Sequence, residues 1–142
     1  MNRPIGVTLL AILDIVFGFL MVISGVAIVA LAGVIEYYGS SGQIPGVPEM
    51  PLVWSLIAAF GGVISVVLLI TAVIEFLIAW GLLGGKGWAW ILTIVLTGIS
   101  IALSIFSLPA SMVVIAVDAL IIYYFFRPHV KAFFGRGPAP IA

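Results

Sequence analysis

Three acidic residues interrupt long apolar stretches of the sequence, where a carboxyl group could bind a proton or a cation. Asp14, Glu75 and Asp118 each lie in such a stretch, and Thr97 places a hydroxyl group in another. A charged side chain in the middle of a membrane costs at least ~2.5 to 3.5 kcal/mol, so carboxyl groups there are typically neutral, paired or functional. We therefore take Asp14, Glu75, Asp118 and Thr97 as a candidate intramembrane polar or ion site.

The composition shows which class of protein surrounds these residues. Hydrophobic residues make up 65% of the 142 and charged residues 7%, against roughly 45 to 50% and about 25% in soluble domains. A soluble core cannot absorb that much apolar surface, so the sequence predicts one all-α integral membrane domain over residues 1–142. The formal net charge is zero, there is no nucleic-acid motif, and there is no cysteine. We expect no nucleic-acid partner, no metal site and no cofactor.

The apolar runs predict an antiparallel, up-down bundle of four transmembrane helices. About 20 helical residues cross the roughly 30 Å hydrocarbon core of a bilayer. We expect helices over residues 5–35, 52–83, 88–107 and 110–126, with an outer loop over 36–51 rich in glycine and proline. The glycine-rich turn 84–87 ends the second helix and Pro109 follows the third. Because these two connections are short, consecutive helices should be antiparallel neighbours.

The basic residues predict the orientation of the bundle. With four spans, all five fall on one side of the membrane: Arg3, Lys86, Arg127, Lys131 and Arg136. The positive-inside rule then places both termini in the cytoplasm, with the chain in the plasma membrane. We expect the tail, residues 127–142, to lie on the inner headgroup surface, because cations near anionic lipid contribute about 1 kcal/mol each. The expected lipid contacts are Arg127, Lys131, Phe133, Phe134 and Arg136.

Helical spacing predicts which way the acidic residues face. Counted from the cytoplasmic ends of their helices, Asp14, Glu75 and Asp118 each lie about 12 to 14 Å deep, in one layer with Thr97. Small or hydroxyl-bearing residues recur at steps of three, four and seven on all four helices, and such residues typically mark packing faces. These stripes include Ala11, Gly18 and Gly25; Gly61, Ser65 and Ala72; Thr93, Ser100, Ser104 and Ser107; and Ser111.

No basic residue lies inside the spans, so three interpretations of the acidic residues stay open. They can be neutral and hydrogen-bonded between helices, they can exchange a proton or a metal cation, or they can meet a cation from a partner subunit.

Parts of the sequence also resemble a known family. The start, RPIGVTLLAILDIVFG, and three motifs in the second half carry the likeness: GKGWAW, the SLP turn and YYFFRPHVKAFFG. They are similar to a family of small four-span membrane proteins of unknown function, found in archaea and some bacteria. The resemblance implies a four-helix topology in a prokaryotic, mainly archaeal, membrane, and it implies no activity.

Two functions are consistent with these features. We expect a small structural or accessory component that packs with itself, as a homo-oligomer, or with a larger membrane complex. The alternative is a small oligomeric transporter or conductor coupled to protons or cations, which uses the intramembrane carboxylates. An enzyme is not expected, because no nucleophile is paired with a base and no metalloenzyme spacing is present.

Overall fold

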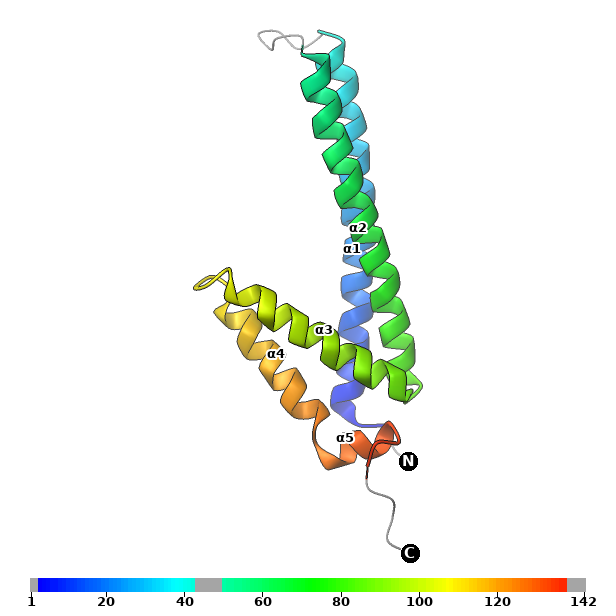
Figure 1. The fold of residues 1–142 in the computed structure, drawn as a ribbon. Helices are drawn as coiled ribbons and strands as arrows, with labels where there is room; N and C mark the ends of the chain where they lie inside the picture. Colours follow the sequence, from blue (N-terminus) through cyan, green and yellow to red (C-terminus); the bar gives the residue numbers. More distant parts are fainter. Residues whose placement is uncertain (1–2, 43–49, 138–142) are drawn as a thin grey trace, which may run out of the picture. The chain divides into compact units, whose positions relative to one another are not determined.

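The chain is built almost entirely of helices (Figure 1). The computed structural model describes residues 3–42 and 50–137, and no strand occurs among them. The helices are α1 (Ile5–Ser40), α2 (Pro51–Leu83), α3 (Gly87–Ile105), α4 (Met112–Phe125) and α5 (Pro128–Phe133). Only helices and closed barrels satisfy all backbone hydrogen bonds in lipid, so long apolar helices are the form expected for these runs. The prediction of an all-α protein is confirmed.

Helix length separates the first three helices from the fourth. α1 has 36 residues, α2 has 33, α3 has 19 and α4 has 14. At 1.5 Å per residue these helices are about 54, 50, 28 and 21 Å long. In the described part of the chain, α1, α2 and α3 are long and apolar enough to cross a membrane, whereas α4 is shorter than a span. The fold is thus that of a membrane protein with three helices of spanning length.

Several predicted boundaries differ from the structure. α1 continues to Ser40 rather than ending at Ile35, so the first five residues of the predicted outer loop are helical. The Ser40 hydroxyl donates a hydrogen bond to the Glu36 carbonyl (2.6 Å) in the last turn of this helix. Gly42, with φ of 66°, then takes the left-handed conformation that commonly follows a helix. The remaining loop residues 43–49 lie outside the described part.

The helices of the second half also begin and end at other residues than predicted. α3 ends at Ile105 rather than at 107, and α4 begins at Met112 rather than at 110. Beyond the four predicted helices, the tail forms α5, with Pro128 in its first turn. Proline fits there because it lacks an N–H group that would have no helical partner.

The structure divides into two units, which we describe separately, and unit 2 comprises residues 15–76. Within it, α1 and α2 run antiparallel and meet through small residues spaced seven apart along α1. A seven-residue step repeats a position after two helical turns, and small side chains let the helices approach closely. The contacting pairs are Gly18 with Phe76, Gly25 with Ser65 and Leu69, Ala32 with Gly61, and Gly39 with Trp54. The packing face predicted from this spacing is therefore confirmed in unit 2.

Unit 1 comprises the described residues of 3–14 and 77–137, and it contains the antiparallel hairpin of α3 and α4. Hydrogen bonds join the hairpin at both ends. The Trp90 indole Nε1 donates to the Phe125 carbonyl (3.1 Å), and the Ser111 hydroxyl donates to the Ser104 carbonyl. The start of α1 joins the end of α4, because the Gly6 amide donates to the Tyr124 hydroxyl (3.1 Å).

The core of unit 1 lies where α1 begins, α2 passes into α3, and α4 ends. Its fully buried side chains include Val7, Leu82, Ala89, Phe125 and Val130. The turn between α2 and α3 is closed by the Lys86 amide, which donates to the Gly81 carbonyl (2.9 Å), and Gly85 has φ of 61°. The predicted glycine-rich turn is confirmed, except that Gly87 is already the first residue of α3.

α5 folds back against this core. Phe134, directly after α5, is 4% exposed and stacks on Phe125 with ring centroids 5.9 Å apart, while Phe133 packs beside Gly85. The expectation that Phe134 contacts lipid is therefore wrong, because its ring is buried in protein, and Phe133 is half-buried. The alternation of cations and aromatic residues in the sequence did not reveal that Phe134 stacks on Phe125 and that Phe133 packs beside Gly85.

Candidate functional site

The hairpin of α3 and α4 places two of the predicted site residues at matching levels. Trp90 and Phe125 are hydrogen-bonded at one end, and Ser104 and Ser111 at the other. Seven residues along α3 from Trp90 is Thr97, and seven residues back along α4 from Phe125 is Asp118. Seven further residues reach Ser104 on α3 and Ser111, the N-cap residue of α4. Thr97 and Asp118 therefore occupy matching levels midway along the hairpin.

Polar atoms near this level lack hydrogen bonds. Within the described part of the chain, Asp118 Oδ2 and Thr93 Oγ1 are buried and have no hydrogen-bond partner. Thr93 lies one helical turn from Thr97. A buried polar group without a partner costs about 1 to 3 kcal/mol, and such groups commonly bind an ordered water or an ion. The chemistry available here is therefore that of a carboxyl group and two hydroxyl groups that can take up a water, a proton or a small cation.

The other two acidic residues of the candidate site lie in different units. Asp14 is half-buried in α1 of unit 1, and Glu75 is half-buried in α2 of unit 2, next to the Phe76 ring that packs on Gly18. Among the residues that the structure describes, no three His, Cys, Asp or Glu side chains lie close enough together to hold a metal ion. The single layer of three acidic residues stays a prediction.

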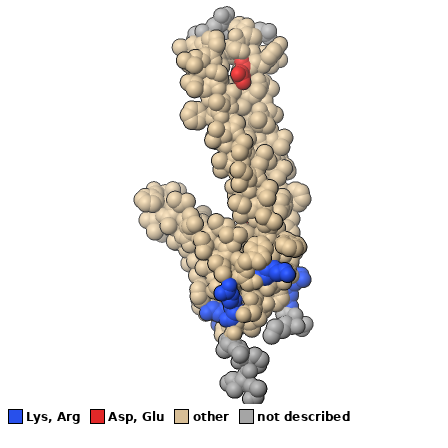
Figure 2. All heavy atoms as spheres, turned by 45° about the vertical axis from the view of Figure 1, so that its right-hand side comes forward, with Lys and Arg blue, Asp and Glu red and all other residues tan. Residues whose placement is uncertain are grey.

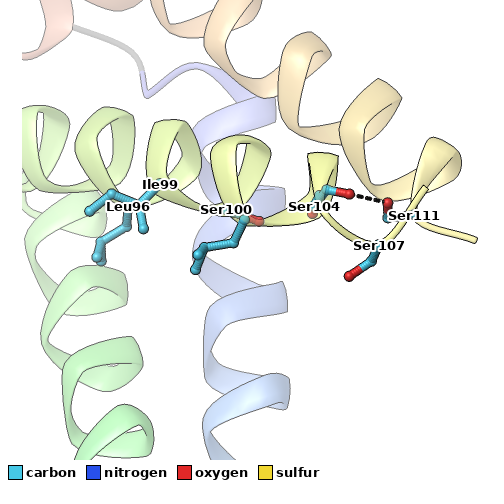
Figure 3. A pocket seen from close by; sticks show the side chains of 7 residues that line it. Leu96, Ile99, Ser100, Ser104, Ser107 and Ser111 are labelled. Carbon is cyan, nitrogen blue, oxygen red and sulfur yellow. Dashed lines mark hydrogen bonds between the residues drawn. The ribbon is translucent and has the colours of Figure 1, made fainter. Parts of the chain in front are cut away.

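A hydroxyl-lined groove lies at the far end of the hairpin (Figure 3). Its volume is about 440 Å³. It is lined by Leu96, Ile99, Ser100, Leu103, Ser104, Ser107 and Ser111. The sequence predicted the serine stripe of α3 as a packing face. In the structure this end of the stripe is open, and its serines line the groove. The hydrogen bond that Ser111 makes here goes to the Ser104 carbonyl and not to a hydroxyl group of the stripe.

The five basic residues of the chain all belong to unit 1. Figure 2 shows Lys and Arg side chains, in blue, gathered at one end of the molecule's visible face. Three of these side chains lie over aromatic rings. Lys131 Nζ is 4.6 Å from the centre of the Phe126 ring, and the Arg127 and Arg136 guanidinium carbons are 5.4 and 5.7 Å from the rings of Tyr123 and Trp90. These contacts hold the three cations against the end of α4 and the beginning of α3.

Comparison with protein-family models, with curated proteins and with solved structures finds no match to this chain. The resemblance to a family of small four-span membrane proteins therefore stays an expectation from the sequence.

Proposed function

We propose that this chain is a structural or accessory component of a cytoplasmic membrane, which pairs with a second copy of itself through the hairpin of α3 and α4. The hydroxyl-lined groove is the observation that carries the proposal. The proposed topology has four membrane segments, α1 to α4, with both termini on the cytoplasmic side.

The hairpin supports an even number of segments although α4 is short. α4 returns along α3 from the Ser104 level to the Trp90 level, so its end lies at the same level as the beginning of α3. If α3 crosses the membrane, α4 carries the chain back. A bilayer adjusts to a short apolar helix by local thinning at a cost of fractions of a kcal/mol per Å. The five cations at this end of unit 1 favour the cytoplasm for it.

The groove supports self-association because its hydroxyl groups lie in a segment that is otherwise apolar. Several large apolar side chains of α3, among them Val95, Ile99 and Leu103, are exposed and are free to face lipid or another protein. Lipid tails offer no hydrogen bonds, whereas a second α3 would offer the same serine stripe and the same close approach. A two-fold axis makes a stripe complementary to itself. Interhelical hydrogen bonds in membranes average about 0.6 kcal/mol each, so three of them favour a reversible dimer.

Disulfide cross-linking in native membranes tests this proposal, because the chain contains no cysteine. We expect Ser104→Cys to form a disulfide-linked dimer under mild oxidation. Ala102→Cys is the matched control, since Ala102 is exposed on the same helix and does not line the groove. Dimers from neither variant, or equal yields from both, would refute pairing through the groove.

A proton- or cation-coupled role is the second candidate. It is favoured by Asp118 Oδ2, which has no hydrogen-bond partner among the described residues. Infrared difference spectra of the protein in nanodiscs, with Asp118→Asn to assign the carboxyl band, distinguish the two. A band that responds to pH between about 6 and 8, or to sodium or potassium, supports the coupled role. A band that stays protonated up to about pH 9 and ignores these ions excludes it.

A further inference from the structure

The apolar parts of α1 and α2 are longer than a bilayer is thick. The apolar run at residues 5–35 of α1 contains one charged residue, Asp14, and the run at residues 52–83 of α2 contains one, Glu75. At 1.5 Å per residue these runs are about 46 and 48 Å long, whereas the hydrocarbon core of a bilayer is about 30 Å thick. A hairpin that crossed the bilayer upright would therefore carry about 16 Å of apolar helix beyond the core.

The two helices adjust to a membrane as a pair, because they are in contact along unit 2. At one end of this unit a Cβ on Gly18 would lie 2.8 Å from the Phe76 ring. At the other end, 21 residues further along α1, Gly39 packs against the Trp54 ring. Figure 1 shows the two helices of this unit side by side between these levels. The excess length therefore belongs to both helices, and the quantity that can change is the tilt of the pair.

The part that would protrude from an upright hairpin exposes large apolar side chains. About 20 residues cross the core, so the core would end near residue 25 of α1. Beyond that residue Val29, Leu31 and Val34 are 51%, 59% and 52% exposed, and Phe60, which precedes the contact of Gly61 with Ala32, is 69% exposed. Water is an unfavourable surrounding for this surface, and lipid is a favourable one.

The residues at the two ends of the apolar runs are of the types that anchor helices at membrane surfaces. Tyr37 and Tyr38 are exposed near the end of α1, with ring centroids 5.1 Å apart, and Trp54 lies at the same level of α2. Aromatic rings of this kind typically lie at the headgroup level. Arg3 and Lys86 bound the runs at their other ends. Tilt is set by such anchors, and an upright hairpin of this length would leave one set of them outside the headgroup layer.

We propose that the hairpin of α1 and α2 crosses the bilayer at a tilt of about 40 to 50° and becomes more upright as the bilayer thickens. A run of about 46 Å spans a 30 Å core at about 50° and spans about 35 Å at 40°. Local thickening of the bilayer accounts for the remaining few ångströms. The inference rests on one part of the proposed function, namely that α1 and α2 both cross the membrane.

Cysteine labelling tests the tilt in nanodiscs of dioleoyl phosphatidylcholine that hold a single copy, because the chain has no cysteine of its own. Val16→Cys, Val29→Cys and Val34→Cys lie on the exposed surface of α1, and Ser41→Cys, in the exposed turn after α1, is the reference in water. Thiols react with a water-soluble maleimide as thiolates and ionise less in apolar surroundings. We expect the three valine positions to be labelled about tenfold more slowly than Ser41→Cys, or slower still.

Val16→Cys is the matched control, since it lies about 16 Å from Ile5 along the helix and is protected whether the hairpin is tilted or upright. A single copy in each disc excludes protection by a second copy. Labelling of Val29→Cys and Val34→Cys as fast as that of Ser41→Cys would show a protruding, upright hairpin and would overturn the proposal.

Polarised infrared spectra of the chain in supported bilayers test the response to thickness. In the longer dierucoyl phosphatidylcholine the amide dichroism should shift toward helices along the bilayer normal, relative to the dioleoyl lipid. An unchanged dichroic ratio would contradict the response.

Failure of the crossing itself has a separate readout in intact cells. An impermeant maleimide should label Ser41→Cys and not Lys86→Cys from outside. Labelling of both would show that α2 does not cross the membrane and would overturn this part of the proposed function together with the tilt. Labelling of Ser41→Cys alone, with fast labelling of Val29→Cys and Val34→Cys in nanodiscs, would overturn the tilt only.

Discussion

Two neighbouring glycines of α2 give the sharpest test of how α1 and α2 pack. A Cβ on Gly61 would lie 2.9 Å from the Cβ of Ala32, whereas a Cβ on Gly62 would meet nothing within 4 Å. Ordinary carbon contacts are about 3.5 to 4.0 Å, so Gly61→Ala must separate the helices by several tenths of an ångström. Neither Cβ can turn away, because both are fixed to helical backbone.

The expected changes in the free energy of unfolding have opposite signs. Overpacking typically costs 1 to 3 kcal/mol, and replacing glycine by alanine inside a helix contributes roughly 0.5 to 1 kcal/mol of stability. We expect Gly61→Ala to destabilise the protein by about 1 to 2 kcal/mol net and Gly62→Ala to leave it unchanged or slightly more stable.

Equilibrium unfolding in bicelles, followed by circular dichroism, measures both variants. The double variant Gly61→Ala/Ala32→Gly should regain most of the loss, because it removes the opposing methyl group. Equal effects of the two single variants, or no recovery in the double variant, would refute this packing between α1 and α2.

Two further substitutions test unit 1. Gly85→Ala should destabilise the protein by at least about 1 to 2 kcal/mol, because Gly85 has φ of 61° and the new methyl group would lie 3.1 Å from the Phe133 ring. The control is Gly135→Ala, where φ is also positive but the space is open. Faster proteolysis of the tail in Gly85→Ala than in the control would show release of α5, and equal rates would contradict it. Thr93→Val should leave the free energy of unfolding unchanged or raise it by up to about 1 kcal/mol in the same assay, because it removes a buried hydroxyl group that has no partner in the described structure. A loss of stability above about 1 kcal/mol would show that the hydroxyl group is hydrogen-bonded.

The sequence was sufficient for those features that depend on composition and on spacing within one helix. Apolar run lengths predicted α1, α2 and α3, and the spacing from Gly18 to Gly25 and from Gly61 to Ser65 predicted the face by which α1 and α2 meet in unit 2. Contacts between distant segments were not predictable in this way. The ring of Phe134 reads as a membrane anchor in the sequence, and only the position of Phe125 at the end of α4 reveals that it is buried.

The sequence also predicted the part of the candidate site that depends on regular helical spacing. Thr97 and Asp118 do occupy matching levels of the hairpin, since both helices are regular and the turn between them is short. Which hydroxyl groups lack a partner depends on side-chain geometry, and the sequence carries no signal for it at Thr93. The open groove at Ser100 and Ser104 was also missed, because a stripe of serines has the same spacing whether or not a second helix covers it.

Energy transfer between labelled copies in vesicles tests most directly whether the hairpin of α3 and α4 pairs with itself. Labels on Ser41→Cys, in the exposed turn after α1, report association as lipid is added. We expect transfer that falls reversibly on dilution. We also expect a dissociation constant about twentyfold higher when Ser100, Ser104 and Ser107 are all changed to alanine, for the loss of three interhelical hydrogen bonds at about 0.6 kcal/mol each. The matched control Ser55→Ala removes a hydroxyl group bonded within α2 and should change nothing. Transfer no greater than chance encounter, or an equal dissociation constant for the triple variant, would contradict the proposed role of the groove.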